Sequence, residues 1–131
     1  ITGNQFIRND LWAIGLMPGA AAHPAQDGKP ANPDGGSIIA NNLISDFGHG
    51  DAHWMWGEER SPFKFDAGQD PDDPPLTDVL IQGNLVHNPG PPRYIYDVII
   101  STEPSGPRGL HFSNNVFPPG TRGVCNQELK P

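Results

Sequence analysis

The densest run of chemically capable side chains lies between residues 46 and 60, and its first half carries His49, Asp51 and His53 at alternate positions. If that half is extended, the three side chains project from one face of the strand. A metal site or an acid/base cluster requires such a face. We therefore nominate His49 as a metal ligand, and Asp51 with His53 as a catalytic pair in which the carboxylate orients the imidazole. A solvated loop with a hydrogen-bonded histidine is the alternative.

Aromatic and charged residues follow directly. Trp54 and Trp56 are either packing residues or a platform on which sugar rings stack. Glu58, Glu59 and Arg60 come next, and Lys64 and Asp66 stand a few positions further on. These charged side chains are expected beside the same face as His49, Asp51 and His53.

A second acidic segment offers three carboxylates within four positions, at Asp70, Asp72 and Asp73. Carboxylate oxygens are the hard ligands that calcium prefers, but the glycine and the regular ligand spacing of an EF-hand loop are absent. The sequence leaves two readings open here, a calcium site and a solvated acidic turn.

A short motif recurs four times and must position these side chains. Each copy reads apolar residue, any residue, Gly or Asn, Asn, any residue, apolar residue, over residues 1–6, 39–44, 81–86 and 112–117. Gly or Asn before the invariant Asn suits a positive φ, so the motif predicts a sharp bend between two short strands. The intervals between successive copies of that Asn are 38, 42 and 31 residues, which indicates a constant corner separated by variable loops.

The invariant residues are predicted to stack. If successive copies lie about 4.8 Å apart, as neighbouring strands do, their amide groups hydrogen-bond along the stack. The predicted structural ladder consists of Asn4, Asn42, Asn84 and Asn115. Four unrelated asparagine turns are the alternative.

The length of 131 residues suits one domain, residues 1–131, with one core. Because 16 Gly and 16 Pro interrupt every stretch with helical periodicity, the fold class is expected to be all-β, with about four coils. Two segments without apolar periodicity, about 19–36 and 67–76, are expected to be surface loop insertions, and 127–131 a polar tail.

The four I-x-G-N-x-I-like turns resemble those of right-handed parallel β-helix repeat proteins of the pectin lyase-like superfamily. The resemblance covers most of the chain and implies a right-handed β-helix solenoid. In lyases of that superfamily, carboxylates hold calcium against a uronate while Lys or Arg removes a proton. Carried over, this makes Arg60 and Lys64 candidate catalytic residues, and Trp54, Trp56, Glu58 and Arg93 candidate substrate ligands. No catalytic signature of the well-studied lyases or polygalacturonases stands in the sequence.

The resemblance also implies a secreted or cell-surface bacterial protein that engages polysaccharide, as part of a lyase or glycoside hydrolase. The cofactor stays open, with calcium as the candidate. The alternative function is a non-catalytic structural module whose open coil edges stack end to end. Because Ile1 already stands inside a repeat motif, we expect self-association or upstream β-helix coils, with this chain a C-terminal fragment.

Charge and hydropathy exclude other partners. Fifteen Asp and Glu against eight Lys and Arg give a net charge of −7, so nucleic acid is not an expected partner. No apolar run approaches the roughly 20 residues of a membrane span. The single cysteine, Cys125, leaves no internal disulfide.

Overall fold

The computed structural model describes residues 1–19, 22–50 and 59–128. Over these ranges the secondary structure consists of ten short β-strands with no α-helix, which confirms the predicted all-β class. No helix in the described ranges is long and apolar enough to cross a membrane.

The strands form three sheets, and every strand pair is parallel. Sheet A has the order β3-β6-β9, with bounds Ile38–Ala40, Thr77–Gln82 and Arg108–Ser113. Sheet B has the order β1-β4-β7, with bounds Gln5–Ile7, Leu43–Ser45 and Leu85–His87. Sheet C has the order β10-β8-β5-β2, with bounds Gly123–Cys125, Tyr96–Ile100, Ser61–Phe65 and Trp12–Leu16.

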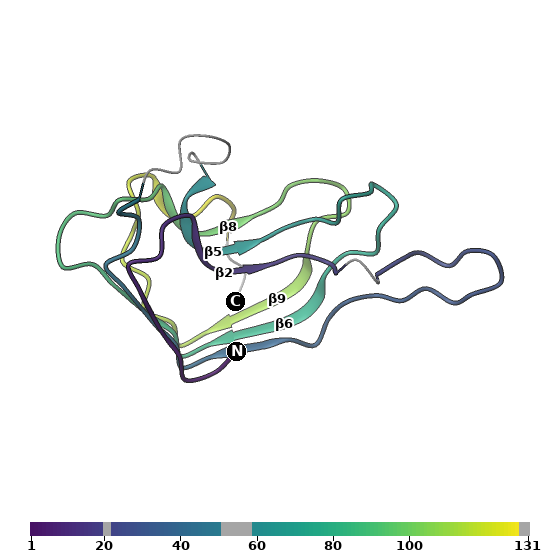
Figure 1. Cartoon of the computed structure of the whole chain (residues 1–131), viewed down its shortest axis with the longest axis horizontal. Helices are drawn as coiled ribbons and strands as arrows, with labels where there is room; N and C mark the ends of the chain where they lie inside the picture. Colours follow the sequence, from purple (N-terminus) through teal and green to yellow (C-terminus); the bar gives the residue numbers. More distant parts are fainter. Residues whose placement is uncertain (20–21, 51–58, 129–131) are drawn as a thin grey trace.

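The chain visits the three sheets in a repeating order. From β3 onward it passes through sheet A, sheet B and sheet C, and then returns to sheet A. On the last passage through sheet B, a single parallel bridge between Leu85 and Val116 replaces a full strand. The inner strands of each sheet therefore pair with strands of both the preceding and the following passage, and the edge strands pair on one side. Figure 1 shows β2, β5 and β8 side by side above β6 and β9.

The corner between sheets A and B is made by the repeated motif. The residue before each invariant Asn has a positive φ, as predicted: 67° at Gly3, 55° at Asn41, 64° at Gly83 and 52° at Asn114. Only Gly and, less readily, Asn or Asp adopt this left-handed conformation at low cost. The choice of residue at this position therefore sets the bend that leads from one sheet into the next.

Hydrogen bonds connect the four invariant asparagines in sequence order. Asn4 Nδ2 donates to Asn42 Oδ1 at 3.1 Å, Asn42 Nδ2 to Asn84 Oδ1 at 2.9 Å, and Asn84 Nδ2 to Asn115 Oδ1 at 3.0 Å. The backbone N–H of each donor residue also binds the same oxygen. Asn42 and Asn84 are buried, and these bonds satisfy amide groups that would be costly to bury alone.

The core lies between the three sheets and is filled by side chains that stack in register. On sheet C, Ile14 lies beside Phe63, and Phe63 beside Val98. Sheets A and B contribute Ile39 and Ile44, both fully buried. Each passage of the chain thus adds one apolar layer to a continuous core.

The two predicted insertions lie outside the strands. The first leaves sheet C after β2, and antiparallel bridges join His23 to Asn32 and Gln26 to Lys29 within it. The second, between β5 and β6, contains the acidic turn. In Figure 1 the first insertion extends as a long arm beyond the sheets.

Candidate functional site

A hollow, called the main cavity below, lies over sheet C and is the largest of the four hollows described in this section. Lys64 on β5 and Ile99 on β8 are paired neighbours that alternate with the core residues Phe63 and Val98. Their side chains therefore point away from the core. They form part of the wall of a cavity of about 590 Å³, which is within the size range of ligand sites. Other residues of the wall include Trp12, Glu59, Asp66, Gln69, Ser101, Thr102 and Glu103.

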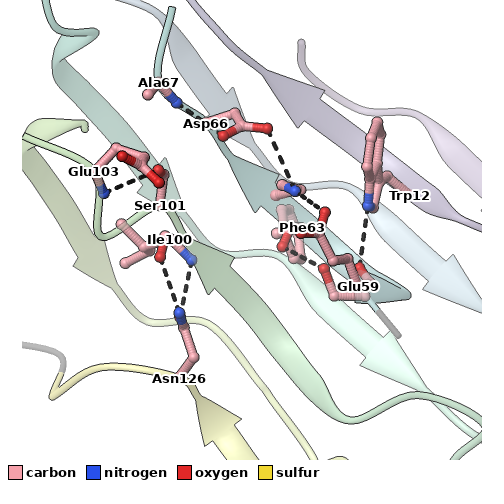
Figure 2. A network of polar contacts seen from close by, with 11 residues as sticks. Trp12, Glu59, Phe63, Asp66, Ala67, Ile100, Ser101, Glu103 and Asn126 are labelled. Carbon is pink, nitrogen blue, oxygen red and sulfur yellow. Dashed lines mark hydrogen bonds and ion pairs between the residues drawn. The ribbon is translucent and has the colours of Figure 1, made fainter. Parts of the chain in front are cut away.

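Lys64 is the centre of the charge network in this cavity. Its ammonium forms ion pairs with Glu59 and, at 3.3 Å, with Asp66, and it lies 5.0 Å from the centre of the Trp12 ring. Trp12 Nε1 donates to the backbone carbonyl of Glu59 at 3.1 Å. Figure 2 shows that Trp12, Glu59 and Asp66 come from the two neighbouring strand segments at β2 and β5. Only 7% of Lys64 is exposed, because these partners surround it.

Glu103 lies where the cavity meets two smaller hollows. Its backbone N–H donates to Ser101 Oγ at 3.3 Å. The adjoining hollows, of about 300 and 170 Å³, both include Glu103 in their walls. Asn126 binds both the N–H and the carbonyl of Ile100, which fixes the segment after β10 against the cavity wall (Figure 2). The three hollows therefore adjoin one another at Glu103.

A separate hollow of about 240 Å³ contains Asp46, His49 and Arg93 and shares no wall residue with the main cavity. His49 Nε2 contacts Asp46 Oδ1, and Arg8 lies 3.7 Å from the same carboxylate. The hydrogen bond from His49 holds the pKa of Asp46 below its usual value. The predicted metal ligand His49 and the predicted substrate ligand Arg93 are therefore brought together here, and Lys64 is not with them.

Arg60 joins Gly48 and Gly50 to Asp10. Its guanidinium lies 3.3 Å from Asp10 Oδ1 and donates to the carbonyls of Gly48 and Gly50. Arg60 is not in the wall of the main cavity, although Glu59 is. From the sequence we expect Arg60 and Lys64 beside one face. In the structure Lys64 lies in the wall of the main cavity and Arg60 does not.

The acidic turn binds its own backbone. Asp73 Oδ2 accepts from the N–H of Asp70 at 3.0 Å, and Asp70 Oδ1 accepts from the N–H of Asp72 at 3.3 Å. Among the described residues, no three His, Cys, Asp or Glu side chains converge as a metal-ion site. Five predicted residues lie outside the described ranges: Asp51, His53, Trp54, Trp56 and Glu58.

A buried polar pair was not anticipated from the sequence. Tyr94 donates to Asp97 Oδ1 at 3.1 Å and accepts from Asn88 Nδ2 at 2.7 Å. Asp97 is fully buried, and burial raises the pKa of its carboxyl to about 7. Burial raises the pKa of Tyr94 as well. The pair lies beside the turn that leads into β10, since Tyr94 also contacts the Pro118 carbonyl.

Sequence reasoning also missed Trp12 and Glu103 as parts of the main cavity. Trp12 is 47 positions from the residue whose carbonyl it binds, and Glu103 belongs to the next passage of the chain through sheet C. The register of the parallel strands brings Trp12 and Glu103 to the same cavity. A local sequence motif does not predict that register.

Comparisons with protein families, curated proteins and solved structures gave no match.

Proposed function

We propose that the chain is a right-handed parallel β-helix. Three observations support this: the repeating order of the three sheets, the parallel pairing of strands from successive passages, and the asparagine ladder at one corner. Parallel connections within a sheet are right-handed in almost all proteins, which supports the handedness. Stacked coils of this kind form an extended surface along the side of the β-helix, on which a polymer can lie.

On this scaffold we propose a polysaccharide-binding function, with the main cavity as the sugar site. The observation that carries it is the cavity of about 590 Å³ with two adjoining hollows that share wall residues with it. Sugar sites combine an aromatic ring with polar side chains that bind hydroxyl groups. Here Trp12 supplies the ring, and Gln69 and Ser101 supply amide and hydroxyl groups.

The contacts of Lys64 favour binding over proton abstraction by this residue. A lysine that acts as a base must give up its proton and face the substrate. The ammonium of Lys64 is instead held between two carboxylates and beside Trp12. Activity as a lyase or a glycoside hydrolase is tested by incubating the protein with polysaccharides and measuring unsaturated products and new reducing ends.

Binding itself is tested by titrating the protein with oligosaccharides in a calorimeter. Thr102 is exposed and belongs to the wall, so Thr102→Trp fills the site without disturbing the core. Thr121, equally exposed, is absent from the wall, and Thr121→Trp is the matched control. We expect affinity to fall by about tenfold or more, roughly 1.4 kcal/mol, in Thr102→Trp alone. Equal affinities of both variants and the parent would place binding elsewhere, and no binding to any sugar would refute the function.

The ends of the ladder favour a second candidate function, the end-to-end assembly of copies. The ladder has a direction, because the hydrogen bonds all run the same way: each side-chain amide donates to the next asparagine in the sequence. Among the described residues, no donor meets Asn4 Oδ1 and no acceptor meets the Asn115 backbone N–H. One end therefore offers the acceptor that the other end lacks, and β1 and β2 are edge strands at the Asn4 end.

Assembly is tested by sedimentation of the parent chain and of Asn4→Asp. The carboxylate still accepts a hydrogen bond, but it adds charge to an end of a chain whose net charge is −7. We expect head-to-tail oligomers of the parent to dissociate in Asn4→Asp at low salt and to return at high salt. A monomeric parent at every concentration would refute assembly and leave sugar binding untouched.

A further inference from the structure

The wall of the main cavity carries an excess of negative charge. Three carboxylates belong to it, those of Glu59, Asp66 and Glu103, against one ammonium, that of Lys64. The adjoining hollow of about 300 Å³ adds Arg108, which is not in the wall of the main cavity. The main cavity is therefore anionic on a chain that is itself acidic.

The charge of Lys64 is already matched inside the protein. Its ammonium contacts both Glu59 and Asp66, and the Trp12 ring lies on another side. Among the described residues, no ion pair involves Glu103, although its backbone is fixed by Ser101. The carboxylate of Glu103 is thus available to pair with a positive charge on a ligand in this cavity.

A uronate chain is a poor fit to these walls. Each of its sugar units carries a carboxylate, which Glu59, Asp66 and Glu103 would repel, and like charges brought together in an interface are strongly unfavourable. A cationic ligand is attracted by the same walls, because an ammonium near Glu103 forms a charge-assisted hydrogen bond.

We propose that the cavity binds a polymer of amino sugars and that Glu103 selects it by binding the protonated amine. The proposal rests on the proposed polysaccharide-binding function and names its substrate class. The remaining wall suits a sugar because Gln69, Ser101 and Thr102 offer amide and hydroxyl groups to the ring hydroxyls. A lysine oligomer shares the charge but has no ring hydroxyls, so it serves as the competing ligand in the tests below.

The test compares three oligosaccharides of equal length by calorimetry at mildly acidic pH: glucosamine, N-acetylglucosamine and galacturonic acid oligomers. They carry positive, zero and negative charge. We expect the glucosamine oligomer to bind about tenfold more tightly than the N-acetylglucosamine oligomer, and the galacturonate oligomer to bind least. A galacturonate oligomer that binds as tightly as glucosamine overturns the proposal.

Two isosteric variants separate recognition by Glu103 from the general attraction of an acidic protein. Glu103→Gln removes one charge in the cavity wall. Asp27→Asn removes one charge in the exposed first insertion, at a positive φ that Asn tolerates. Only Glu103→Gln is expected to reduce the preference for glucosamine over N-acetylglucosamine. An equal reduction in both variants would mean that net charge alone attracts the polymer and would refute the role of Glu103.

Two further outcomes distinguish this proposal from the function on which it rests. If N-acetylglucosamine oligomers bind, lose affinity in Thr102→Trp and match glucosamine oligomers, sugar binding stands and selection for the amine fails. A lysine oligomer of equal charge tests whether the cavity recognises charge alone. It does so if this oligomer binds as tightly as the glucosamine oligomer and Glu103→Gln lowers both affinities equally. That result overturns the assignment to amino sugars.

Discussion

The side-chain amide of Asn42 donates a hydrogen bond of 2.9 Å to the side-chain carbonyl of Asn84, a residue 42 positions further along the chain. Asn42 Nδ2 also donates to the carbonyl of Ile1, and Asn84 Nδ2 to that of Ile39. Each amide therefore fastens one corner of the chain both to the next asparagine and to the strand beside it.

Asn84→Ala is expected to lower the free energy of unfolding by about 1–3 kcal/mol, the cost of leaving buried polar partners without hydrogen bonds. Asn84 is 1% exposed and binds Asn42, Asn115 and the Ile39 carbonyl. Asn4→Ala, at the exposed end of the ladder, should cost less than about 1 kcal/mol. Denaturant unfolding measures both, and equal losses would contradict the ladder as a stabilising element.

Asn114→Ala is expected to destabilise the chain by about 1 kcal/mol, because Asn114 has a φ of 52° that disfavours a residue with an ordinary Cβ. Asn114→Gly should remain within about 0.5 kcal/mol of the parent, since glycine adopts this conformation without strain. The comparison uses thermal unfolding of the two variants. The opposite order would show that the Asn114 side chain, and not its backbone, matters.

Stability is expected to depend on pH through Asp97. Its pKa is about 7 in the folded chain and 3.8 when exposed, so the folded state holds the proton more tightly than the unfolded state. The stabilising effect of this proton is complete below pH 3.8, declines as pH rises towards about 7, and is lost above it. Denaturant unfolding across this range measures the decline.

Asp97→Asn supplies the control for this dependence, because Asn keeps the shape of the side chain without the titration. The difference in free energy of unfolding between parent and variant should change with pH between about 4 and about 7 and be level above that range. A difference that stays constant with pH would contradict the raised pKa of Asp97.

Lys64→Met should lower the free energy of unfolding at neutral pH by about 1–2 kcal/mol. The loss of the ammonium leaves Glu59 and Asp66 facing each other, but both are partly exposed, so the cost stays below that of a fully buried pair. Lys29→Met, at an exposed lysine in the first insertion, controls for the change in net charge.

The all-β class and the sharp corners could be predicted from the sequence because they follow from single residue types at fixed offsets. Gly3, Asn41, Gly83 and Asn114 precede the invariant asparagines, and a positive φ is a local property of such residues. The stacking of Asn42 on Asn84 follows from the same repetition, because equal corners place equal side chains in register.

The candidate site could not be predicted in the same way, since its members do not repeat. The sequence points to Lys64 as a candidate site residue. Trp12 and Glu103, which share its cavity wall, come from other passages of the chain. The register between β2, β5 and β8 brings them together, and the variable insertions conceal that register in the sequence. His49 and Arg93 were assigned to separate roles for the same reason, although they share one small hollow.

The intervals between the bonded asparagines, 38, 42 and 31 residues, bear on how the chain acquires its structure. Every rung closes a loop of that length, so few contacts are local and the first closure is slow. Once two corners are joined, each further corner docks on a surface that already exists, and it closes only one more loop. We therefore expect folding to begin with one pair of neighbouring corners and to spread outward by successive addition.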